Sequence, residues 1–193
     1  LKERFDRMED QLSILELFRI TPAESTFDYQ GKTVALKNCP ALPKAAQESG
    51  IPIIVGGGGP KRTPNLAARF ANEFNLPFSS PTDFELQANR VRQACESISR
   101  EADSMVFSVA QVLCIGTTEK ELERRSAKIG RDLSELRENG VAGTLDEARE
   151  RIKSFQQLGV SRMYFQVLDE DDLDHVSLLS ELLDEFTEVE ENA

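Results

Sequence analysis

The chain has 193 residues, of which 39% are hydrophobic and 30% charged, enough for one substantial hydrophobic core and few for two comfortable domains. Its 34 acidic and 23 basic residues give a net charge of −11, which disfavours nucleic acid and anionic membranes as partners. We therefore expect a single domain, residues 1–193, in a soluble protein.

Cysteine and histidine usage argues against metal and disulfide chemistry. Cys39, Cys95 and Cys114 are widely spaced without a CxxC pair, and His175 is the single histidine. This pattern predicts no disulfide framework, no metal site and a reducing, cytoplasmic compartment. Because DEDDLDHVSLL places His175 among acidic residues, we expect it to be a solvated surface side chain. Cys114 lies in an apolar segment, which predicts an inert core thiol.

The first 50 residues predict a helix and then an excursion from the core. Residues 1–20 carry apolar side chains at helical spacing from the first position without a capping residue, as in a helix entered midway. Residues 21–50 are rich in turn formers, and FDYQGKTVAL has the alternation and the Gly31 turn of a hairpin. No apolar run reaches about 18 residues, and LKERFDRMEDQ lacks a signal-peptide core.

Residues 51–193 predict four strand–helix units. The expected strands are 51–55, about 74–77, 105–115 and 162–168, and the expected helices are 64–72, 83–100, 118–128, 145–158 and 173–186. In the helix over 83–100, the apolar residues expected on one side are Leu86, Val91, Ala94 and Ile98. Strands that alternate with helices in this way indicate a parallel sheet, either doubly wound or in a β/α barrel.

A run of four glycines marks the first strand-to-helix turn, in IPIIVGGGGPKRTPNL. Residues without a Cβ let the backbone approach a ligand closely, and two cations beside a helix N-terminus favour an anion such as phosphate. The dinucleotide fingerprint GxGxxG and the P-loop both fail in this register. A flexible tight turn with solvated cations is the alternative. The candidate binding residues are Gly56, Gly57, Gly58, Gly59, Lys61, Arg62 and Thr63.

Three stretches resemble the luciferase-like monooxygenase family of flavin- and deazaflavin-dependent β/α-barrel oxidoreductases. They are RFDRMEDQLSILELF with FDYQGKTVAL, ALPKAAQESGIPIIVGGGGPKRTPNLAARFANEFNLPF, and RDLSELRENGVAGTLDEARERIKSFQQLGVSRMYFQVL. The resemblance implies an α/β fold of the (β/α)8 TIM-barrel type, present as a C-terminal half-barrel of about four parallel strands. A complete barrel typically needs ~250 residues, which agrees with that reading.

The resemblance also implies a cofactor, FMN or the deazaflavin coenzyme F-420, whose phosphate or ribityl chain lies on the glycine loop. Asn75 and Phe78 are then expected near the cofactor, and Gln166 matches a polar position that can line the pocket. Phe74 stands where the family usually has Trp, and we expect it in the core. No catalytic acid or base is nominated.

The function implied is hydride transfer to or from a small-molecule substrate by an oxidoreductase or monooxygenase. Two alternatives remain open: a non-catalytic cofactor-binding or assembly half-barrel, and another β/α-barrel enzyme that acts on a phosphorylated metabolite. Open edges at IPIIV and RMYFQVL predict a homo-oligomer, most simply a two-fold dimer.

Overall fold

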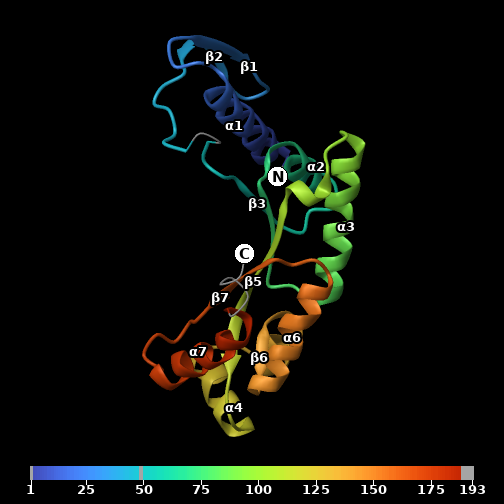
Figure 1. The fold of residues 1–193 in the computed structure, drawn as a ribbon, viewed down its shortest axis with the longest axis vertical. Coiled ribbons are helices and arrows are strands. Elements are labelled where there is room, and N and C mark those ends of the chain that lie inside the picture. The colour runs from blue at the N-terminus through green and yellow to red at the C-terminus, as the bar shows by residue number, and fades with distance from the viewer. Residues whose placement is uncertain (1, 48–49, 188–193) are drawn as a thin grey trace. The chain divides into compact units, whose positions relative to one another are not determined.

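In a computed structural model, residues 2–47 and 50–187 are described (Figure 1). The chain divides into two compact units. The first is formed by residues up to Phe74 together with Arg90–Met105, and the second by Asn75–Asn89 together with the residues from Val106 onward. None of the helices in the described part combines the length and the apolar character of a membrane span.

The first unit begins with helix α1 (Lys2–Ile20) and a hairpin of β1 (Thr26–Gln30) and β2 (Ala35–Pro40). The two strands pair antiparallel, in the segment where the sequence predicts a hairpin. Residues 1, 48 and 49 of the expected helix and excursion lie outside the described residues.

Asp10, a buried residue of α1, fastens the hairpin turn to the helix. Its carboxylate accepts hydrogen bonds from Tyr29 Oη at 2.9 Å, the Lys32 amide at 3.1 Å, and the amide and Oγ1 of Thr33 at 2.6 and 2.8 Å. Burial alone would raise the pKa of Asp10, but these bonds outweigh it and hold the pKa well below its usual range. At Gly31, a Cβ would stand 2.4 Å from Asp10 Oδ1, so the turn needs glycine for close approach.

The strand expected over 51–55 is shorter than predicted, and it is not buried along its length. β3 covers Ile54–Gly56, and only Val55 within it is buried. Ile51, which precedes the strand, and Ile54 are 72% and 53% exposed, and β3 is an end strand in the described sheet order. Asn72 Oδ1 accepts a hydrogen bond from the Ile53 amide at 2.9 Å, which fixes the chain entering β3.

Helix α2 (Arg62–Phe70), β4 (Glu73–Pro77) and α3 (Pro81–Ser97) follow, and β4 and α3 contribute residues to both units. The predicted apolar side of α3 is partly wrong, since Leu86 and Ile98 are 53% and 49% exposed. The buried apolar residues of α3 are Phe84, Ala88, Val91, Ala94 and Cys95. Four of these recur at three- to four-residue spacing, so the inward stripe lies off the predicted one.

The second unit is organised around β5 (Val106–Ile115). It pairs in parallel with β6 (Val141–Gly143) and with β7 (Arg162–Gln166), which confirms the predicted α/β fold with parallel strands. The helices of this unit beyond α3 are α4 (Glu119–Lys128), α5 (Leu133–Asn139), α6 (Leu145–Gln157) and α7 (Leu173–Thr187). The short β6 and α5 add to the four predicted strand–helix units.

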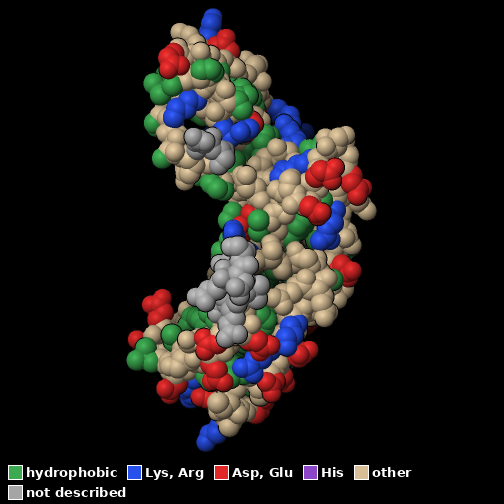
Figure 2. Space-filling view, in the orientation of Figure 1, with side chains coloured by type: hydrophobic (Ala, Val, Ile, Leu, Met, Phe, Trp, Pro, Cys, Tyr) green, Lys and Arg blue, Asp and Glu red, His purple; other side chains and the backbone are tan. Residues whose placement is uncertain are grey.

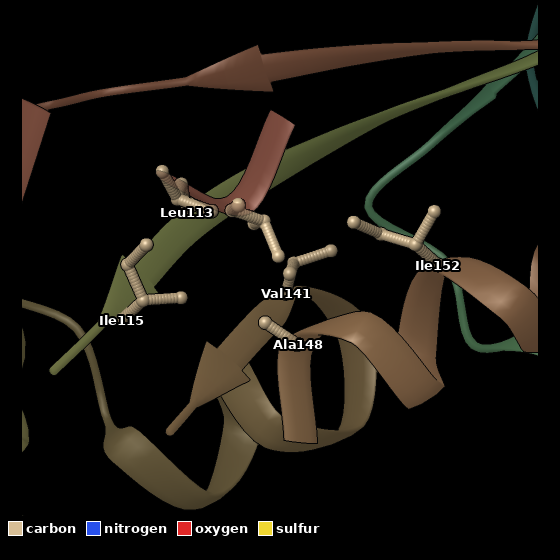
Figure 3. Packing of buried hydrophobic residues seen from close by; sticks show 6 residues of the cluster. Leu113, Ile115, Val141, Ala148 and Ile152 are labelled. Atoms are coloured by element: carbon tan, nitrogen blue, oxygen red, sulfur yellow. The ribbon is translucent and has the colours of Figure 1, made fainter. Parts of the chain in front are cut away.

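The C-terminal half of β5 is buried on both faces, because alternate side chains of a strand point in opposite directions. One face packs Leu113 and Ile115 against Val141, Ala148 and Ile152 (Figure 3). The other face packs Val112 and Cys114 against helices α4 and α5 through Leu122 and Leu136. Burial raises the pKa of the Cys114 thiol, which agrees with the predicted inert core residue.

The prediction for His175 is wrong. The side chain is 4% exposed, and its Nε2 accepts a hydrogen bond at 3.1 Å from the Ile115 amide at the end of β5. Glu170, Asp171 and Asp174 are exposed, as expected, whereas the Asp172 side chain is largely buried and the imidazole faces inward. Figure 2 shows acidic side chains over the helices of this unit. Acidic neighbours along the chain do not predict whether His175 is exposed, because one position of a helix can face the strand while the positions beside it face solvent.

Candidate cofactor site

The glycine loop between β3 and α2 has open space at two positions where a Cβ would otherwise stand. Gly57 has φ +118°, a conformation that side-chain-bearing residues rarely adopt. A Cβ placed on Gly57 or Gly58 would meet no heavy atom within 4 Å, whereas one on Gly59 would lie 2.7 Å from Thr63 Oγ1. Gly59 therefore serves packing, and Gly57 and Gly58 leave a space in which a ligand could contact the main chain.

Helix α2 begins at Arg62 directly after this loop, and its N-terminus carries no side-chain cap. Pro64, in the first turn, has no amide hydrogen, and the Asn65 amide already donates to the Lys61 carbonyl. The helix dipole places partial positive charge at this end. The first turn is thus suited electrostatically to an anion.

The two predicted cations have different surroundings. Arg62 Nη2 lies 2.7 Å from Asp6 Oδ1 and 3.3 Å from Glu9 Oε2, and the guanidinium stands 5.1 Å from the centre of the Phe5 ring. Lys61 is exposed, and none of the ion pairs found in the described part of the chain includes it. In this geometry Arg62 ties α2 to α1, and Lys61 is the cation left to face a ligand.

A network of charges secures this contact between α1 and α2. Glu9 also lies 2.6 Å from Arg69 and 3.1 Å from Lys32. The hydrogen bond from Arg62 lowers the pKa of Asp6, and that from Lys32 lowers the pKa of Glu9. Sequence reasoning missed these acids, although their separation of three positions on one helix face is a detectable signal.

A hollow of about 370 Å³ adjoins the loop on the α1 side. Its walls are almost wholly apolar, formed by Lys2, Phe5, Gly59, Pro60, Lys61 and Arg62. An apolar recess beside an uncapped helix start can receive a ligand that carries both an anionic group and a hydrocarbon portion.

Asn75 belongs to the second unit, where its Nδ2 donates to Ser108 Oγ at 2.9 Å. Ser108 is fully buried on β5, and sequence reasoning did not single it out. Phe78 has φ +51° and is 44% exposed beyond β4, with its amide bonded to the Ala110 carbonyl at 2.8 Å. Phe74 is fully buried, as expected.

A second buried polar group accompanies the end of β4. Gln111 Nε2 donates to the Ser79 carbonyl at 2.9 Å, while Gln111 Oε1 is buried and finds no hydrogen-bond partner in the described structure. Gln166 closes β7 with an exposed side chain. Within residues 2–47 and 50–187, no three His, Cys, Asp or Glu side chains gather to hold a metal ion.

The sequence model of the luciferase-like monooxygenase family matches residues 1–139, most of the chain. The chain belongs to the luciferase-like monooxygenase family. No curated protein sequence matches it significantly.

Solved structures of luciferase-like and related enzymes share the fold at low identity. An F-420-dependent secondary alcohol dehydrogenase, solved with an F-420–acetone adduct, has a TM-score of 0.75 at 12% identity, over 94% of this chain and 62% of that one. The F-420-dependent tetrahydromethanopterin reductase of Methanopyrus kandleri has a TM-score of 0.71 at 15% identity, over 91% of this chain and 61% of the reductase chain. The oxygenating constituent of a 3,6-diketocamphane monooxygenase from Pseudomonas putida, solved with FMN, has a TM-score of 0.58 at 14% identity, over 91% of this chain and 60% of that chain.

The chain therefore spans about three fifths of these solved luciferase-like and related chains. Over that part it has their α/β fold with parallel strands, as in a partial barrel. The family and its structural neighbours are flavin- or F-420-dependent oxidoreductases and monooxygenases.

Proposed function

We propose that this chain serves a luciferase-like oxidoreductase that uses FMN or the deazaflavin F-420, and that the loop Gly56–Thr63 holds the phosphate of that cofactor. The observation that carries the proposal is the open space beside Gly57 and Gly58, where a Cβ would otherwise stand, next to an uncapped helix start. Both cofactors carry a phosphate, so the loop chemistry suits either. When bound, the cofactor supplies hydride transfer, with oxygen chemistry in monooxygenases.

The chain's own contribution to this function is binding and orientation. The loop backbone approaches phosphate oxygens where no side chain intervenes, the α2 dipole adds a favourable field, and Lys61 supplies an exposed positive charge. Arg62 acts indirectly, because its pairing with Asp6 holds α2 against α1 and so fixes the end of the loop. We propose a small-molecule substrate for the enzyme and a cytoplasmic location, which the three free thiols support.

Charge reversal at Lys61 tests the binding role. Lys61→Glu is expected to lower the affinity for FMN or F-420 about tenfold at low ionic strength, with a smaller effect in high salt, because the group is exposed and screened. Fluorescence titration of both cofactors measures it. Lys120→Glu, an exposed substitution on α4 with the same charge change, is the control.

Equal binding by the Lys61 and Lys120 variants would contradict the role of Lys61. If the chain bound inorganic phosphate and sugar phosphates at the loop but neither cofactor, the alternative of an enzyme for a phosphorylated metabolite would replace the proposal.

We also propose that the chain forms a homodimer through exposed apolar sheet residues. Ile51 and Ile54 stand at the end strand β3, and Tyr164 on β7 is 39% exposed. Sedimentation at micromolar concentration is expected to give twice the 21.6 kDa chain mass. Ile51→Lys should shift the protein toward monomer, while Ile98→Lys, at another exposed isoleucine, should not. A wild-type monomer that binds no apolar dye would refute the dimer.

A further inference from the structure

Side chains from two helices form hydrogen bonds with the last residue of β5. Arg125 of α4 donates through Nη1 to the Ile115 carbonyl at 2.7 Å, and His175 of α7 accepts at Nε2 from the Ile115 amide at 3.1 Å. Both polar groups of this final strand residue are therefore satisfied by side chains.

Asp172, the residue before α7, accepts hydrogen bonds that hold Arg125 and His175 in these positions. Its carboxylate accepts from Arg125 Nε at 2.9 Å and Nη2 at 3.1 Å, and from Arg124 at 2.9 Å. It also accepts from the His175 amide at 3.0 Å, as an N-cap residue does. The side chains of Arg125 and Asp172 are 3% and 7% exposed, so the pair is buried.

The direction of the Ile115–His175 bond fixes the protonation state of the imidazole. A backbone amide can only donate, so Nε2 must carry its lone pair and the ring must be neutral. A protonated ring would set two N–H groups against each other at 3.1 Å, and a side chain that is 4% exposed has little access to solvent for a replacement acceptor. Protonation and this docked position of α7 are therefore incompatible.

We propose that His175 is a pH-sensitive latch, whose protonation releases the start of α7 from the end of β5. The helix is otherwise held by Leu182, which is fully buried, by the partly buried Leu178, Leu179 and Phe186, and by Glu185, which pairs with Arg149 and Lys153 of α6. Release therefore begins at the N-terminal turn of α7.

The charges that face the imidazole come from α4 and from the loop before α7. Arg125 opposes protonation, while Asp172, Asp169 and Glu121 favour it. Burial is the largest influence, and together with Arg125 it lowers the pKa of His175 below its ordinary value. Because the released state has the higher pKa, it binds more protons, and docking weakens as the pH falls below about 6.5.

The composition isolates this effect. His175 is the single histidine of the chain, and the carboxyl groups with shifted pKa values all shift downward, for example Asp6, Asp10 and Asp172. Their stabilising contributions are present above their unfolded pKa values of about 4 and are lost only in stronger acid. A change between pH 7.5 and 5.5 therefore reports on the imidazole.

Hydrogen exchange on the intact chain tests the latch. Corrected for intrinsic rates, protection of the α7 amides is expected to be about tenfold lower at pH 5.5 than at pH 7.5. Amides of α2, in the other unit, should keep their protection. His175→Gln retains an acceptor for the Ile115 amide but cannot titrate, so α7 protection should become independent of pH over this range.

A second measurement on the wild type decides the matter even if the glutamine variant does not fold. The single imidazole can be titrated by NMR, and its pKa in the folded chain is expected below 6.5. A folded pKa at or above 6.5 would overturn the proposal. So would an equal loss of protection in α2 and α7, or a pH dependence retained by His175→Gln.

Discussion

Asp172→Ala is expected to lower the free energy of unfolding by about 3 kcal/mol, because it leaves the buried Arg125 guanidinium with Glu121, at 3.1 Å, as its remaining acidic partner. The substitution also removes the N-cap of α7, which by itself costs about 1 kcal/mol. Urea denaturation at pH 7.5 measures the loss. The large effect follows from burial, since an exposed ion pair contributes little.

Asp171→Ala is the matched control for this experiment. Asp171 is the preceding residue and carries the same charge, but its side chain is exposed. Its removal should change the stability by less than about 0.5 kcal/mol. If the two alanine variants were equally stable, the Arg125–Asp172 pair would not contribute as its geometry indicates.

Gly58→Ala is expected to weaken the binding of FMN or F-420 roughly tenfold or more while leaving the melting temperature unchanged. The added methyl meets no protein atom within 4 Å, so the fold has no reason to move. A phosphate on the loop would occupy that space, and displacing it from one backbone donor forfeits a charge-assisted hydrogen bond of about 1.5–3 kcal/mol. Calorimetric or fluorescence titration of both cofactors provides the measurement.

Gly130→Ala is a stringent control for the Gly58→Ala variant. It also adds a methyl in open space, after α4 in the second unit, and its φ of +67° makes it the more strained of the two. It should leave cofactor affinity unchanged even if it lowers stability slightly. Undiminished affinity in a folded Gly58→Ala protein would remove the glycine loop from the cofactor site.

Local patterns along the chain were enough to predict several of its elements. The helices predicted over 118–128, 145–158 and 173–186 became α4, α6 and α7 almost at the predicted bounds, and the long apolar run became β5. The four glycines lie between a strand and a helix, at the turn where the sequence predicted them. Three quoted stretches were also enough to indicate the family that the comparisons confirm.

The partner of each polar side chain depends on long-range packing, which no local pattern predicts. Arg62 lies 56 positions from Asp6, and His175 lies 60 from Ile115, so no local period could indicate either contact. The same limit explains the misplaced stripe of α3, where exposed Leu86 and Ile98 fit the helical spacing about as well as the residues that are buried. Apolar periodicity indicates that one face of a helix is buried, but long-range packing determines which face it is. The same packing determines which charged side chains form ion pairs within the protein and which can contact a ligand.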